Sequence, residues 1–125
     1  MDVAEALDNL RAEVTGCQLA AFSDLSSKMV LCFSAGGRRA QEELDELSEI
    51  AVTVLDGPVA DGAQYFLESQ KPASAMTLTK VDLRVFLRSP KSENEALICV
   101  CSPQTNIATL VDRGRSALDQ IVAAG

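Results

Sequence analysis

The chain has 125 residues, of which 47% are hydrophobic and 23% charged, and this ordinary globular mix predicts a single domain over residues 1–125. The net charge of −7 argues against nucleic-acid and anionic-membrane partners, because both need clustered Lys and Arg side chains. No apolar run approaches the roughly 18 residues of a membrane span, and the acidic, periodic N-terminus is unlike a signal peptide. We therefore expect a cytoplasmic protein.

The N-terminal third predicts a helix followed by a β-hairpin. Residues 2–14 carry apolar side chains at three- and four-residue steps, with Asp2 in position to cap the helix. Gly16 follows the last periodic residue and suits a left-handed helix stop. Two apolar segments, 17–23 and 28–34, are joined by so short a polar turn that an antiparallel hairpin is expected.

The next segment, residues 41–55 or QEELDELSEIAVTVL, predicts a long amphipathic helix. Its apolar side chains recur with helical spacing and form one stripe. The members of this stripe are Leu44, Leu47, Ile50, Ala51, Val54 and Leu55. Acidic residues fill the other side of its first half, where the helix dipole favours negative charge. The stripe can pack on the protein's own sheet, but Val52 and Leu55 widen it enough to suggest a second buried surface.

Three strands and a closing helix are predicted after the middle helix. Residues 75–79 form a short strand with Met76 and Leu78 on one face, and 81–89 alternates as a half-buried strand. Residues 96–101 are apolar on both faces, as is the strand at 17–23, so both belong in mid-sheet with helices on both sides. The final helix covers 105–123. The segment before these strands could hold a further helical piece, which Gly62 and Pro72 weaken. The resulting architecture is an α/β/α three-layer sandwich around an antiparallel sheet.

Three stretches carry a resemblance to the roadblock/dynein light-chain family, whose fold is profilin-like and longin-like. They are the hairpin GCQLAAFSDLSSKMVLCFSAGG, the long helix from Gln41, and VFLRSPKSENEALICVCSP with its closing helix. The resemblance covers most of the chain except residues 57–74. It implies a five-stranded antiparallel sheet of order 2-1-5-4-3, with the two terminal helices on one face and the middle helix on the other.

The resemblance also implies a function. Family members are typically homodimers whose middle helices and third strands meet across a two-fold axis, and they act as non-catalytic platforms, some for small Ras-like GTPases and others for motor-protein chains. The prediction is therefore a non-enzymatic dimeric module that binds or regulates a GTPase or another NTPase, without a cofactor. Its expected dimer or partner interface comprises Leu47, Ile50, Ala51, Val54, Met76 and Leu78. The alternative is a small-molecule sensing domain of related shape, with an apolar ligand cavity.

A basic stripe is one further candidate site, formed by Lys80, Arg84 and Arg88 on the same side of a predicted strand as Phe86. It could meet an acidic partner or the acidic middle helix. It could also be a solvated strand face on which the Arg stems lie along Phe86. We favour the solvated face.

Motifs for catalysis or metal binding are weak. Cys17, Cys32, Cys99 and Cys101 lie in or beside apolar strands and are interpreted as buried thiols. Cys99 and Cys101 share a strand face, but a C-x-C spacing without His favours neither zinc binding nor a redox role. Residues 36–39, GGRR, precede a helix and match no phosphate-binding pattern. The chain has no His, so no His-based nucleophile system can form, and we expect no enzyme and no metal.

Overall fold

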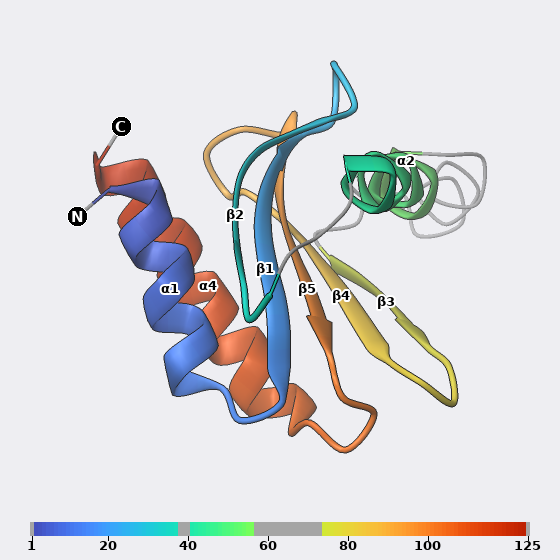
Figure 1. Cartoon of the computed structure of the whole chain (residues 1–125). Helices are drawn as coiled ribbons and strands as arrows, with labels where there is room; N and C mark the ends of the chain where they lie inside the picture. The colour runs from blue at the N-terminus through green and yellow to red at the C-terminus, as the bar shows by residue number, and fades with distance from the viewer. Residues whose placement is uncertain (1, 38–40, 57–73, 125) are drawn as a thin grey trace, which may run out of the picture.

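The computed structural model describes residues 2–37, 41–56 and 74–124. Five strands form one antiparallel sheet of order β2-β1-β5-β4-β3, and this confirms the predicted topology. Helices α1 and α4 cover one face of the sheet and α2 lies on the other, as Figure 1 shows. The elements are α1 (Val3–Glu13), β1 (Cys17–Asp24), β2 (Met29–Ala35), α2 (Gln41–Asp56), β3 (Ser74–Leu78), β4 (Leu83–Arg88), β5 (Glu95–Cys101) and α4 (Ile107–Ala124). The possible helical piece after α2 falls outside the described residues.

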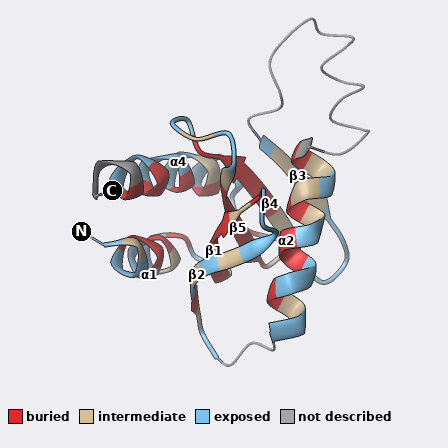
Figure 2. Ribbon diagram, turned by 90° about the horizontal axis from the view of Figure 1, so that it is seen from above, coloured by how far each residue is buried: buried red, intermediate tan, exposed pale blue. Residues whose placement is uncertain are grey.

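The core has two layers, one on each face of the sheet. Both central strands, β1 and β5, contribute buried side chains to both layers, as their apolar sequences predicted. Figure 2 shows the buried side of each helix turned toward the sheet. On the α1/α4 side the largest buried residues include Leu7, Leu10, Leu97 and Leu118. On the α2 side they include Leu19, Leu47, Leu55, Phe86 and Ile98.

Local signals define the start of both terminal helices and the end of α1. Asp2 Oδ1 accepts a hydrogen bond from the Glu5 backbone N–H at 2.8 Å and so caps α1. Gly16 has a φ of +95°, a conformation that favours glycine, where the chain turns from α1 into β1. At α4, Asn106 Oδ1 accepts from the Thr109 N–H at 3.0 Å. Asn106 is therefore the cap of α4.

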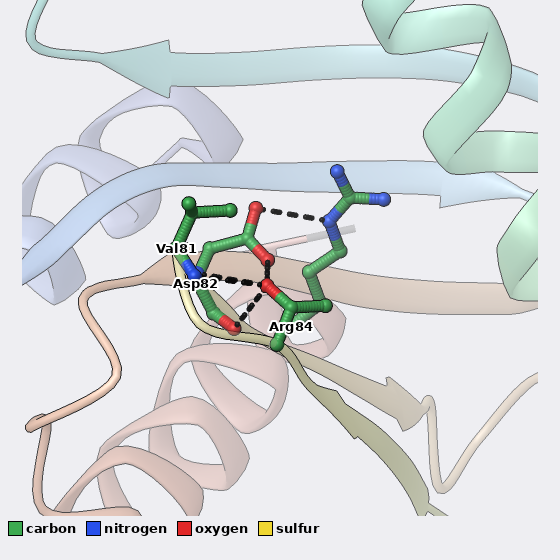
Figure 3. A network of polar contacts seen from close by, with 4 residues as sticks. Val81, Asp82 and Arg84 are labelled. Carbon is green, nitrogen blue, oxygen red and sulfur yellow. Dashed lines mark hydrogen bonds and ion pairs between the residues drawn. The ribbon is translucent and has the colours of Figure 1, made fainter.

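The turn between β3 and β4 shortens the strand that the alternation predicted, because β4 begins only at Leu83. The Thr79 N–H donates to Asp82 O at 2.9 Å, and Thr79 Oγ1 accepts from the Val81 and Asp82 N–H groups. Asp82 also pairs with Arg84 Nε at 3.3 Å, and Figure 3 shows this network. Val81 therefore lies in the turn and is 78% exposed, although the alternating pattern had placed it in the strand.

The favoured interpretation of the basic stripe as a solvated strand face was wrong for Arg88 and for the neighbouring Phe86. Phe86 is fully buried and Arg88 is only 8% exposed. The reason is that α2 covers this face of β4, so Phe86 packs in the α2 layer of the core. Lys80 remains exposed, and Arg84 is partly exposed beside Asp82.

Candidate interaction surface

Helix α2 turns its apolar stripe onto its own sheet. Leu44, Leu47, Ala51 and Leu55 are buried there against residues of β1, β4 and β5. Two residues of the predicted interface, Leu47 and Ala51, thus lie in the protein's own core. The widening of the stripe by Leu55 is also explained by this intramolecular packing.

Two polar anchors fix α2 to the sheet. Ser48 is fully buried, and its Oγ lies 3.1 Å from the buried Ser23 Oγ of β1. At the C-terminal end of α2, Arg88 Nη2 donates to Leu55 O at 2.7 Å, and its Nη1 donates to Glu93 O at 2.6 Å. A guanidinium at the last turn stabilises the carbonyls of a helix C-terminus and offsets the negative end of its dipole. The position of α2 over the sheet is therefore held at its middle and at its C-terminal end.

The outer surface of α2 combines an apolar flank with an acidic face. Ile50 and Val54 lie four residues apart on one flank and are half-buried, so their remaining surface is open to a partner. The exposed acidic residues are Glu42, Asp45, Glu46 and Glu49. This surface can bind a partner whose apolar contact region is bordered by basic groups.

Strand β3 is an edge strand, and its exposed apolar side chains lie away from α2. Met76 is 49% exposed and Leu78 is 66% exposed. Their antiparallel partners on β4 are Val85 and Leu83, which belong to the core layer beneath α1 and α4. Because directly opposed residues point to the same sheet face, Met76 and Leu78 lie on the α1/α4 side. The predicted interface residues therefore divide between the core and two opposite faces of the sheet.

The opposite edge of the sheet, formed by β2, is a surface that the sequence pattern did not predict. There β2 exposes Met29, Leu31 and Phe33. Regular alternation would place these three residues on one strand face, but a register shift in the pairing with β1 interrupts it, so that Val30 and Cys32 lie in opposite core layers. Only the strand order shows that β2 is an edge. Exposed apolar residues on an edge strand are a second possible docking region.

A cavity of about 390 Å³ lies where α1 ends and α4 begins. Its lining includes Glu13, Thr15, Ser102, Thr105 and Thr109. The volume falls in the range of small-molecule sites, which are mostly apolar with a few placed polar groups. Hydroxyl and amide side chains supply six of its nine lining residues.

The cysteines occupy the α1/α4 side of the sheet. All four are free thiols; Cys99 and Cys101 are buried, as predicted, whereas Cys17 and Cys32 are only half-buried. Within residues 2–37, 41–56 and 74–124, no group of three or more His, Cys, Asp or Glu side chains is arranged to hold a metal ion. No helix in these same ranges is long and apolar enough to cross a bilayer.

The sequence matches no protein-family model, and no curated protein is significantly similar to it. Solved structures do match. A Roadblock/LC7 domain from Streptomyces avermitilis superposes with a TM-score of 0.84 at 10% identity, over 99% of this chain and 98% of that chain. The chain has the roadblock/LC7 fold.

Two structures of MglB agree with this assignment. Myxococcus xanthus MglB superposes on the roadblock-like chain with a TM-score of 0.78 at 9% identity, over 98% of this chain and 93% of its own. An MglB structure with a tetrameric arrangement superposes with a TM-score of 0.80 at 13% identity, over 97% of this chain and 85% of that chain. At such identities the likeness establishes the fold alone, so function rests on the surfaces described above.

Proposed function

We propose that this protein is a non-enzymatic roadblock-like module that forms a homodimer and serves as a binding platform for a small Ras-like GTPase or another NTPase. The observation that carries the proposal is the exposed apolar pair Met76 and Leu78 on the edge strand β3. An edge strand with exposed apolar residues is prone to pair with another strand, and a second copy of the same strand is the simplest partner.

The geometry supports edge-to-edge pairing across a two-fold axis. Two β3 strands side by side would continue the sheet, and Met76 and Leu78 of both copies would meet on the α1/α4 side. On the other face, the half-buried Ile50 and Val54 of α2 join the proposed contact because the roadblock resemblance implies that the middle helices meet across the same axis. One isologous contact would thus cover both apolar regions, although they lie on opposite sides of the sheet.

The acidic face of α2 determines what else the dimer can bind. Glu42, Asp45, Glu46 and Glu49 are exposed, so parallel α2 helices in close contact would repel each other. Antiparallel placement separates the two acidic halves and leaves them facing outward. Such a surface favours a partner with basic residues around its contact region, and the roadblock resemblance makes a Ras-like GTPase the first candidate to test.

The test of dimerisation uses Leu78→Asp and Ile50→Glu, which place charges on the two proposed contact regions. Val81→Asp is the matched control, because Val81 is also exposed and apolar but lies in the turn beyond β3. Light scattering at micromolar concentration should give a dimer for the wild type and the control, and a monomer for the other two variants. A monomeric wild type would refute the dimer.

The test of the platform role is affinity capture by the dimer, followed by single-turnover GTP hydrolysis by any captured GTPase with and without the module. A change in hydrolysis rate that the Ile50→Glu variant abolishes would support the proposed role. Hydrolysis of nucleotide by the purified module alone would contradict its non-enzymatic assignment.

A further inference from the structure

Three cysteine side chains gather at one end of the sheet. Cys17 opens β1 and Cys101 closes β5, and the two are partners in the antiparallel pairing of these central strands, just beyond a register shift between Cys17 and Leu19. Cys99 lies two residues before Cys101 and so faces the same side, where it belongs to the same core layer. The residue opposite Cys99 is Ala20, so only Cys101 has a cysteine directly across the ladder.

The backbone spacing at this pair suits a disulfide. The Ser102 N–H donates to Gly16 O at 2.9 Å, immediately outside the pair, so Cys17 and Cys101 form a non-hydrogen-bonded pair. In such pairs the Cα atoms lie about 4.5 Å apart and the side chains are close together. Disulfides span Cα separations of roughly 4.4–6.8 Å. The two sulfurs can therefore be joined with little movement of the strands.

The surroundings activate one thiol of the pair. Hydrogen bonds from the Cys101 and Cys99 thiols lower the pKa of Cys17, and the Arg11 guanidinium adds to the effect; burial opposes it. When Cys17 is a neutral thiol, its S–H donates a weak hydrogen bond to Leu19 O, with an Sγ–O distance of 3.6 Å. The interaction with Cys17, together with burial, raises the pKa of Cys101. Cys17 is also half-buried, whereas Cys101 is fully buried, so an oxidant reaches Cys17 more easily.

Cys32 provides an internal comparison. It is half-buried like Cys17, but burial and the nearby Asp2 and Asp8 carboxylates raise the pKa of its thiol. Exposure alone therefore does not distinguish the two residues. The two residues differ in their neighbours, because only Cys17 has another cysteine directly across the ladder.

We propose that Cys17 and Cys101 form a reversible disulfide driven by peroxide, with Cys17 as the oxidised thiol and Cys101 as the resolving thiol. The Cys17 sulfur attacks one oxygen of hydrogen peroxide and the O–O bond breaks. Cys17 becomes a sulfenic acid, and the leaving hydroxide takes up the proton of the thiol to form water. The Cys101 sulfur then attacks the Cys17 sulfur, the S–O bond breaks, and a second water leaves. Overall, two thiols and one peroxide give one disulfide and two waters. A dithiol reverses the reaction by exchange.

The experiment treats the full-length protein with hydrogen peroxide, blocks residual thiols with N-ethylmaleimide and maps cross-linked peptides by mass spectrometry. The expected product joins Cys17 to Cys101 and has lost two hydrogen atoms. Fragmentation within the β5 peptide must place the bond at Cys101 and not at Cys99. A bond at Cys99, or oxidation of Cys17 to sulfinic acid without any disulfide, would overturn the proposal.

Variants separate the two roles. Cys101→Ser should stop at a Cys17 sulfenic acid, which dimedone traps, whereas Cys99→Ser and Cys32→Ser should still form the disulfide. Trapping at Cys17 should exceed trapping at Cys32 by at least about tenfold in the Cys101→Ser protein. Equal trapping at both residues, or a disulfide that persists in Cys101→Ser, would refute the assignment. The wild-type peptide map decides the bond even if a variant folds poorly.

Discussion

Replacing Arg88 with Met should detach the C-terminal end of α2 from the sheet. Arg88 is 8% exposed, and its guanidinium donates to Leu55 O and Glu93 O at 2.7 and 2.6 Å. Hydrogen bonds from charged groups contribute roughly 1.5–3 kcal/mol each, and a buried carbonyl left without a donor adds a penalty. Met fills part of the space with apolar atoms. We therefore expect the free energy of unfolding to fall by about 3 kcal/mol, which corresponds to the loss of one strong hydrogen bond together with the penalty for the carbonyl left without a donor.

The assay is urea denaturation followed by circular dichroism, at one fixed protein concentration because a dimer would make stability depend on concentration. Arg84→Met is the control, since Arg84 pairs with Asp82 at a partly exposed site where ion pairs contribute at most about 1 kcal/mol. Equal losses in the two variants, or a loss below about 0.5 kcal/mol for Arg88→Met, would refute the anchoring role.

Two further outcomes follow from the packing and the thiol environment. Gly16→Ala should lower the free energy of unfolding by about 2–3 kcal/mol, because its φ is +95° and a Cβ there would lie 2.5 Å from a threonine oxygen. Gly37→Ala, where a Cβ meets nothing within 4 Å, should change unfolding little, and similar denaturation midpoints for both variants would contradict this account. Alkylation of Cys17 by iodoacetamide should remain fast as pH falls from about 8 to about 6, because its lowered pKa keeps the thiolate populated. Alkylation of Cys32, whose pKa is raised, should slow steeply over the same pH range. A parallel decline of the alkylation rate at both residues would contradict the effect of the Cys99 and Cys101 thiols on Cys17.

Periodicity was sufficient for the central parts of the fold. The strands at Cys17–Asp24 and Glu95–Cys101 are apolar on both faces, and only mid-sheet positions bury both faces. The helical stripe of α2 was equally clear. The strand order came from the family resemblance, because alternation within a strand carries no information about its neighbours.

The sequence pattern could not predict which segments far apart in the chain lie in contact. Alternation separated Leu83 and Val85 from Phe86, but it could not show that α2 covers the Phe86 side. The interface implied by the family resemblance grouped Met76 and Leu78 with residues of α2, although the register with β4 turns these two side chains to the other face. The pairing of Cys17 with Cys101 also depends on a register between strands at opposite ends of the chain.

The central claim is that β3 is the edge through which two copies associate. Hydrogen–deuterium exchange of the backbone amides tests it most directly, in samples at high and at very low protein concentration. The account predicts that exchange in Ser74–Leu78 slows at high concentration, while exchange in the other edge strand, Met29–Ala35, does not change. Protection of Met29–Ala35 alone, or no effect of concentration on either strand, would contradict it.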